Sequence, residues 1–288
     1  MIITNHTEEL TLTNKDNTNN KVLLGKYNFV NVLPINVPLD GLKLKNTIST
    51  YGTPNTINNL LNSGQLNAGP ISLYEYLRYQ EKYVLLNDIS ISSQKTVGSV
   101  ILFSKTAIEN LNNKKIGIAH TSSTSVKLLQ LLIRVKCKTD SLYVVHKYEK
   151  DLTSLLNIYD AVLFIGDPAL INNYNDNLDK NIIKYDLAEE WYKITGLPMT
   201  FGVWVASKNW SINNNKQLQS LNTDLINAKN EGLNNQYEKV LQIAKKETNL
   251  NEEILNIYFK QQLNYDLNDG NKKSITLFTS MLKDYKLI

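Results

Sequence analysis

The sequence predicts an α/β fold with two lobes around a central ligand cleft, and three observations lead to this. From Lys21 onward, short apolar runs alternate with amphipathic helical patterns, which is typical of α/β proteins. The 288 residues, 42% of them hydrophobic, suffice for one large domain or two lobes. After Lys208 the strand patterns stop and helical patterns take over. This order indicates a middle lobe inserted into the first.

The N-terminal lobe begins after a polar segment. Residues 1–20 are rich in Asn, Thr and Lys and predict a mobile N-terminal extension, within which 10–13 could form a short edge strand. The strands predicted next are 22–24, 47–51, 67–71, 83–91 and 97–103. Thr53-Pro54 predicts a helix start with a hydroxyl N-cap and proline at the first position, and Gly64 ends that helix. Ser72 is expected to cap the following helix.

The middle lobe has its own strands and helices. Its predicted strands are 116–119, 142–146, 161–165, 182–185 and 201–206, and its helices start at Thr124, near Asp151 and around Glu189. In the helix from Thr124, polar residues form one narrow stripe, so the helix must be mostly buried. The chain is expected to cross between lobes near Ser104 and to return near Val205. Lobe I then comprises 21–103 and 205–288, lobe II comprises 104–204, and the cleft between them is the expected ligand site.

A run of five hydroxyl residues, Thr121-Ser122-Ser123-Thr124-Ser125, joins a predicted strand to the predicted helix. A helix N-terminus offers unpaired N–H groups and a positive dipole end, and hydroxyls add donors. This junction therefore favours a carboxylate or phosphate on a small molecule. The alternative is that one hydroxyl caps the helix while the others face water.

Three further positions are candidate site residues. Asn31 follows the first strand and could donate to a ligand, or cap a turn before Pro34. Gly98-Ser99 interrupts an apolar strand, which indicates either close approach of a ligand or a bulge. Gly166-Asp167 ends another strand, where Asp167 would be explained as a helix N-cap.

Composition and motifs limit the classes of function. The net charge is +4, but the lysines are scattered and no basic run alternates with aromatics, so no nucleic-acid partner is expected. No secretory signal and no apolar run of membrane-spanning length is expected. Cys137 is the only cysteine, which excludes an internal disulfide and suggests a cytoplasmic protein. The histidines show no metal-ligand spacing, and dinucleotide or phosphate-loop motifs are missing, so a site without metal or cofactor is expected.

An ordered set of segments in this sequence matches one known family. The segments are Asn31-Val32-Leu33-Pro34, Gly52-Thr53-Pro54, Gly69-Pro70-Ile71-Ser72 with Glu75-Tyr76, Asp88-Ile89-Ser90-Ile91-Ser92-Ser93, Val97-Gly98-Ser99-Val100, Ser123-Thr124-Ser125-Val126, Ile165-Gly166-Asp167 and Tyr185-Asp186-Leu187-Ala188-Glu189-Glu190-Trp191 with Thr195-Gly196-Leu197-Pro198. Over roughly residues 25–207, the sequence thereby resembles the chorismate dehydratase family of the futalosine route to menaquinone. This chain departs from the family pattern at Phe29, Asn67, Leu73 and Pro168. The changes at Phe29 and Leu73 remove hydroxyls that could contact a ligand.

The resemblance implies a type II periplasmic-binding-protein-like fold and the loss of water from chorismate to give 3-[(1-carboxyvinyl)oxy]benzoate. It implies that Asn31 orients the substrate as the catalytic residue. The implied substrate-binding residues are Ser72, Ser99, Ser123, Thr124, Ser125, Gly166 and Asp167. No matched side chain is an obvious base, so the substrate's enolpyruvyl carboxylate is the leading candidate, with His120 or Asp167 as others.

Two other functions remain open from the sequence. One is a non-catalytic binding protein for a small organic anion. The other is a diverged paralogue that acts on another cyclohexadiene carboxylate. Oligomeric state is not predicted.

Overall fold

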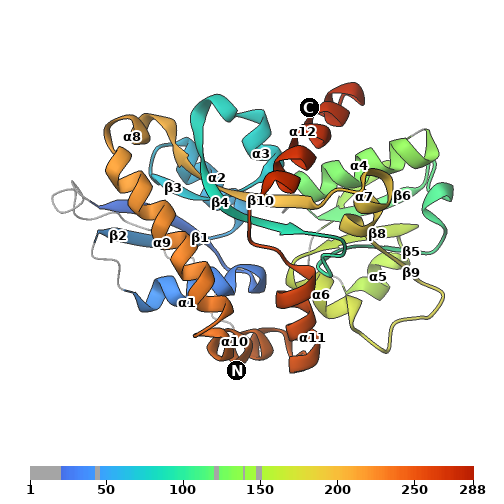
Figure 1. The fold of residues 1–288 in the computed structure, drawn as a ribbon. Coiled ribbons are helices and arrows are strands. Elements are labelled where there is room, and N and C mark those ends of the chain that lie inside the picture. Colours follow the sequence, from blue (N-terminus) through green and yellow to red (C-terminus); the bar gives the residue numbers. More distant parts are fainter. Residues whose placement is uncertain (1–20, 43–45, 120–122, 139, 147–150) are drawn as a thin grey trace.

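The computed structural model describes residues 21–42, 46–119, 123–138, 140–146 and 151–288. The predicted extension, 1–20, lies outside these residues. The described strands form two five-stranded sheets, one in each half of the molecule (Figure 1). In spatial order, the first sheet contains β2 (Thr47–Gly52), β1 (Val22–Tyr27), β3 (Ala68–Ser72), β10 (Met199–Ser207) and β4 (Tyr83–Ser93). The second contains β7 (Leu142–His146), β6 (Lys115–Ala119), β8 (Ala161–Ile165), β5 (Val100–Ser104) and β9 (Ile183–Asp186).

Each sheet contains one strand that runs against the others. In the first sheet, β1 pairs in parallel with β2 and β3, and β10 lies antiparallel between β3 and β4. In the second, β6 pairs in parallel with β7 and β8, and β5 lies antiparallel between β8 and β9. The antiparallel strand of each sheet is the first strand that the chain forms after it crosses into that lobe. The predicted two-lobed α/β fold is confirmed.

The two crossings lie earlier in the chain than the expected points. Because β5 pairs with β8 and β9, the chain leaves the first sheet between Ser93 and Val100 and not near Ser104. Because β10 pairs with β3 and β4, the chain has returned by Met199, before Val205. Apolar composition alone could not show which sheet a buried strand joins.

Helices cover the faces of both sheets. Those of the first lobe are α1 (Leu33–Gly41), α2 (Pro54–Asn62), α3 (Leu73–Arg78), α8 (Lys208–Asn213), α9 (Asn215–Leu233) and α10 (Tyr237–Thr248). Those of the second are α4 (Ser123–Cys137), α5 (Leu152–Leu156), α6 (Asp167–Asn173) and α7 (Leu187–Thr195). The chain ends with α11 (Glu252–Ile257), the π-helix η5 (Tyr258–Gln262) and α12 (Asp269–Asp284). The C-terminal helices extend over both lobes (Figure 1).

Local caps explain several helix boundaries. Thr53 Oγ1 accepts the Thr56 N–H at 3.2 Å, and Pro54 is the first residue of α2, as predicted. Gly64, just past the end of α2, has φ +73°, a conformation that glycine adopts without strain. Ser72 caps α3 by accepting the Glu75 N–H at 3.2 Å.

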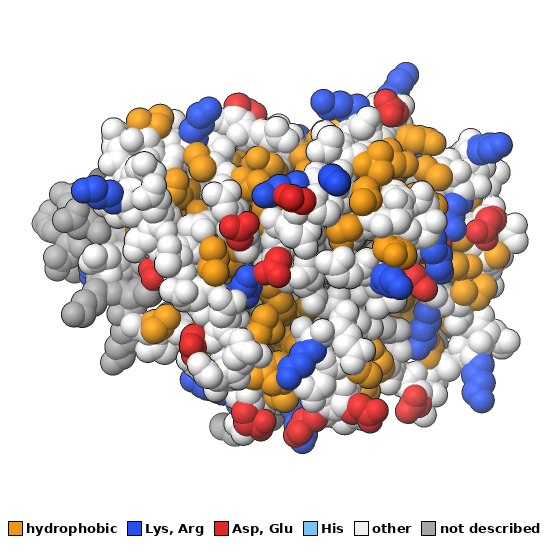
Figure 2. All heavy atoms as spheres, in the orientation of Figure 1, with side chains coloured by type: hydrophobic (Ala, Val, Ile, Leu, Met, Phe, Trp, Pro, Cys, Tyr) orange, Lys and Arg blue, Asp and Glu red, His pale blue; other side chains and the backbone are white. Residues whose placement is uncertain are grey.

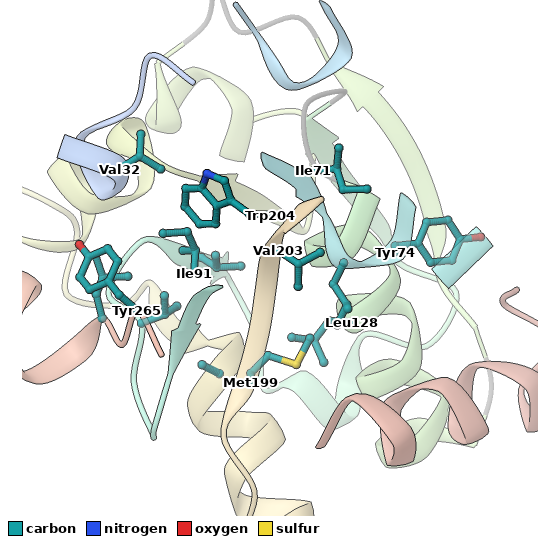
Figure 3. Packing of buried hydrophobic residues seen from close by; sticks show 14 of the residues in the cluster. Val32, Ile71, Tyr74, Ile91, Leu128, Met199, Val203, Trp204 and Tyr265 are labelled. Carbon is teal, nitrogen blue, oxygen red and sulfur yellow. The ribbon is translucent and has the colours of Figure 1, made fainter. Parts of the chain in front are cut away.

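The largest hydrophobic core is shared by both lobes. Met199 and Val203 of β10 lie beside Leu128 of α4, with Tyr74 of α3 nearby (Figure 3). Five apolar residues of α4 are fully buried, which confirms the prediction for this helix: Leu128, Leu129, Leu131, Leu132 and Ile133. This burial packs the middle of α4 against β10 and α3 of the first lobe.

Charged side chains of both signs are interspersed on the face seen in Figure 2, and apolar side chains show between them near its middle. Among the described helices, none combines the length and the apolarity that crossing a bilayer requires.

Candidate functional site

A cavity lies between the two lobes and contains about 720 Å³ of space free of protein atoms, including the part open to solvent. Its lining residues are Tyr27, Phe29, Asn31, Val32, Pro54, Ile71, Ser72, Ile91, Val97, Ser99, Val100, Ser125, Ile165, Gly166, Phe201 and Gly202. Most of this wall is apolar, and its polar side chains are uncharged. Val32, Ile71 and Ile91 also belong to the hydrophobic core (Figure 3). The part of the cavity wall that they form is therefore packed against the protein interior.

The topology of the sheets places the cavity where parallel strands end. Tyr27 is the last residue of β1, Ser72 the last of β3 and Ile165 the last of β8. In open α/β sheets, ligands bind beyond the carboxyl ends of the strands. The two sheets present these ends to the same cavity.

Four helices begin at the cavity. Pro54 is the first residue of α2, Ser72 and Gly166 are the N-caps of α3 and α6, and Ser125 lies in the first turn of α4. Each helix N-terminus carries a partial positive charge. Their convergence gives a cavity without charged lining residues a preference for an anion.

Asn31 lies in the short 3-10 helix η2 (Val30–Val32) between β1 and α1. The Tyr265 hydroxyl donates to its backbone oxygen at 3.0 Å, which fixes the segment. Asn31 Oδ1 is buried and has no hydrogen-bond partner among the described residues. Burying an unpaired amide costs stability. The Asn31 amide is therefore available to a ligand in the cavity.

Ser72 and Ser99 are arranged as hydrogen-bond donors. Ser72 Oγ already accepts the Glu75 N–H, and Ser99 Oγ accepts the Tyr258 hydroxyl at 3.0 Å. Ser99 Oγ itself donates to the Val97 carbonyl at 3.5 Å, which is a weak hydrogen bond. The Ser72 hydroxyl can therefore donate its proton to a ligand, and the Ser99 hydroxyl can do so by giving up its weak bond to the Val97 carbonyl.

The hydroxyl run divides into residues with different roles. Thr121 and Ser122, with His120, lie outside the described residues. Ser123 is exposed and does not line the cavity. Thr124 is buried, and its Oγ1 accepts the Tyr74 N–H at 3.0 Å, so it joins α4 to α3. Of the described hydroxyls in the run, Ser125 alone lines the cavity.

Asp167 is not the N-cap of α6, contrary to the sequence prediction. Gly166 caps the helix with φ +70°, and Asp167 is its first residue. The Asp167 carboxylate instead accepts the Val30 N–H of the other lobe at 3.1 Å. Burial raises the pKa of the Asp167 carboxyl to about 6; the Val30 N–H lowers it and the charge of Glu247 raises it. Asp167 thus connects the lobes one residue from Asn31, and Gly166 lines the cavity.

Gly98 and Ser99 precede β5 and are not within it, contrary to the prediction. Gly98 has φ +70° and, with Val97, donates its N–H to the Asp186 carboxylate at 2.7 Å and 2.8 Å. Burial raises the pKa of Asp186 to about 6, although four N–H donors lower it. Asp186 also caps α7. One carboxylate therefore holds the loop that presents Ser99.

Two residues at the site were not found by sequence reasoning: Tyr27, which lines the cavity, and Tyr258, which bonds Ser99 from outside the cavity wall. Tyr27 was missed because the sequence marked only the opening of the first strand, Val22-Leu23-Leu24, and this strand continues to Tyr27. Tyr258, which lies on a π-helix, contacts Ser99 from the opposite end of the chain. π-helices are frequent at functional sites, but nothing local in the sequence distinguishes them from α-helices.

No group of three or more His, Cys, Asp or Glu residues in the described part of the chain is arranged to hold a metal ion.

The fold and the cavity define a two-lobed α/β protein of the periplasmic-binding-protein type. Residues 22–284 match the family model described as menaquinone biosynthesis, and the chain belongs to this family. It is 31% identical over 226 residues to the chorismate dehydratase of Thermus thermophilus, covering 73% of this chain and 77% of that protein.

Solved structures support the same fold. Protein AF1704 of Archaeoglobus fulgidus superposes with a TM-score of 0.72 at 16% identity, covering 94% of this chain and 99% of that chain. The periplasmic aliphatic sulphonate binding protein SsuA of Escherichia coli gives a TM-score of 0.64 at 14% identity, covering 93% of each chain.

Proposed function

We propose that this protein is a chorismate dehydratase, which eliminates water from chorismate to give 3-[(1-carboxyvinyl)oxy]benzoate. Membership of the menaquinone biosynthesis family and the likeness to the Thermus enzyme support this assignment. The proposal includes the futalosine route, a reaction without metal or redox cofactor, and a cytoplasmic location, in keeping with a single cysteine.

The observation that carries the proposal is the cavity itself. Uncharged donors and four helix N-termini surround an apolar space, with the Asn31 amide unpaired. Chorismate has a ring for the apolar walls, two carboxylates for the donors and a hydroxyl for the amide. The Asn31 carboxamide can accept from or donate to that hydroxyl.

The reaction breaks two bonds on neighbouring ring carbons. The carbon that bears the enolpyruvyl ether loses its proton, and the next carbon loses hydroxide. The electron pair of the C–H bond becomes the π bond that completes the benzene ring, and proton and hydroxide together are the water released. Aromatisation supplies the driving force, so the protein must mainly orient the substrate and stabilise developing charge.

The described residues fit distinct roles in this reaction. Asn31 orients the leaving hydroxyl and donates to it as the C–O bond breaks. Ser72, Ser99 and Ser125 hold the carboxylates, assisted by the helix N-termini. Thr124 and Asp167 support the site from outside the cavity wall, because their oxygens bond Tyr74 and Val30.

The substrate itself supplies the base in this proposal. No carboxylate or amine side chain is among the residues that line the described cavity. The enolpyruvyl carboxylate is tethered to the carbon that loses its proton, which gives it a high effective concentration there.

The rival function is capture of an organic anion without turnover, since SsuA has this fold and is a binding protein. Incubating the pure protein with chorismate and following the mass of the ligand separates the two. A dehydratase releases the product that has lost one water. Intact chorismate recovered from a stable complex identifies a binding protein, and failure to bind identifies a paralogue with another substrate.

A further inference from the structure

The inner wall of the cavity contains a second unpaired polar group besides Asn31. The Tyr27 hydroxyl is buried and has no hydrogen-bond partner among the described residues, and Tyr27 lines the cavity. An unpaired buried hydroxyl costs stability, because water is lost and nothing replaces it. A phenylalanine would fill the same space without that cost. The hydroxyl therefore needs an explanation other than packing.

The backbone of Tyr27 is held rigidly. It is the last residue of β1, paired with Gly52 of β2, and its carbonyl accepts the Asn36 side-chain amide at 2.9 Å. The Tyr27 ring lies edge-on to Phe29, with centroids 6.2 Å apart and planes at 72°. A donor fixed in this way loses little conformational freedom when a ligand binds.

The surroundings keep the phenol protonated. Burial is the main reason why its pKa lies well above the usual value of 10, and the charge of Glu75 raises the pKa further. Near neutral pH, Tyr27 is therefore a neutral hydrogen-bond donor. Its neighbours along the cavity include Phe29 and Phe201, and in such an apolar setting a single hydrogen bond to an anion is strong.

We propose that the Tyr27 hydroxyl donates a hydrogen bond to an oxygen of the bound substrate and is a direct binding residue of this cavity. This inference rests on the proposed function, because it names a further contact to the same dicarboxylate. The same hydrogen bond would let the site discriminate between the substrate and its analogues. An analogue without an acceptor at that position leaves the buried hydroxyl unpaired in the complex, so it binds less well.

The test is Tyr27→Phe, which removes one oxygen and keeps the ring. The free variant should unfold at the same temperature as the wild type or higher, since no protein hydrogen bond is lost. Its KM for chorismate, or its Kd from calorimetry if the wild type does not convert chorismate, should rise about tenfold, the change expected from one hydrogen bond. Higher stability together with weaker binding is a result that a purely structural tyrosine does not give.

Tyr83→Phe is the matched control. The Tyr83 hydroxyl donates to Asn62 Oδ1 at 2.8 Å, and Tyr83 does not line the cavity. This variant should lose thermal stability and keep the wild-type Kd and turnover. The two substitutions therefore have opposite expected effects on stability and on binding.

The outcomes separate this inference from the proposed function. If the wild type binds chorismate without converting it, the dehydratase assignment fails, while the ratio of the two Kd values still decides the role of Tyr27. If Tyr27→Phe binds chorismate as tightly as the wild type, the Tyr27 contact is overturned and the proposed function is unaffected. If the wild type binds no chorismate, both are overturned.

Discussion

The Asp167 carboxylate, at the start of α6, accepts the backbone N–H of Val30 across the boundary between the lobes. This contact lies beside Asn31 and holds a buried carboxyl whose pKa is raised to about 6. The contact between the lobes beside Asn31 therefore involves a side chain that can change its protonation state near pH 6.

Asp167→Asn should change how stability depends on pH. A raised carboxyl pKa means that the folded protein binds the proton more tightly than the unfolded chain. The stability contributed by that proton is present below about pH 4 and is lost as pH rises through about 6. The asparagine side chain of the variant does not titrate in this range. The free energy of unfolding of the variant, relative to that of the wild type, should therefore increase between about pH 4 and about pH 6 by on the order of 2 kcal/mol. Urea unfolding at several pH values measures the difference, and parallel curves for the two proteins would contradict it.

Gly232→Ala should destabilise the fold although alanine usually favours a helix. A Cβ at this position of α9 would lie 1.8 Å from the Pro34 carbonyl oxygen, so the helices must separate. We expect a loss of about 2–3 kcal/mol, with reduced turnover because α1 follows Asn31 directly. Gly41, the last residue of α1, has no atom within 4 Å of such a Cβ. Gly41→Ala should therefore be neutral or stabilising by about 0.5 kcal/mol in thermal unfolding.

Tyr258→Phe should impair substrate binding through Ser99. Ser99 Oγ accepts the Tyr258 hydroxyl and donates weakly to the Val97 carbonyl. Without the Tyr258 hydroxyl, nothing opposes a shift of Ser99 Oγ that shortens its bond to Val97 and moves its proton away from a ligand. The KM should rise about threefold to tenfold, as in Ser99→Ala, with a smaller effect on kcat. Because both changes remove the same interaction, the double variant should be little worse than either one. Steady-state kinetics of all four proteins tests this, and strictly additive effects would rule it out.

Asn31→Ala should lower turnover about 100-fold or more without a loss of stability. The amide has no protein partner among the described residues, so its removal breaks no bond in the free protein. Asn36→Ala is the control, since Asn36 Nδ2 is buried and donates to the Tyr27 carbonyl. That variant should lose stability by about 1–2 kcal/mol. Equal thermal shifts in the two variants would show that Asn31 has a structural role as well.

The sequence predicted helix starts and buried helix faces well, because these features depend on residues that are close together in the chain. The Thr53-Pro54 start of α2 and the buried face of α4 follow from capping and periodicity. The membership of β5 and β10 in their sheets depends on long-range pairing, and the sequence does not encode this locally. The prediction that Asp167 is a helix N-cap was wrong for the same reason. A carboxylate after a strand is usually a cap, and the Val30 N–H that it binds is 137 residues away in the chain.

Part of the cavity wall was predicted. Asn31, Ser72, Ser99, Ser125 and Gly166 were chosen from motifs, and all of them line one cavity. The signals for the other contacts were weaker. Tyr27 appears as an ordinary aromatic residue after a strand, and its unpaired hydroxyl is visible only when the surrounding side chains are known.

The position of β10 in the first sheet affects the order in which the lobes can fold. The second sheet consists of residues 100–186 in one continuous stretch, so all its strands are available before synthesis of the chain ends. The first sheet lacks its fourth strand until residue 207 has been made, and β4 has no partner in that sheet before then. During translation, the later lobe can therefore be complete while the strand edges of the earlier one still await β10.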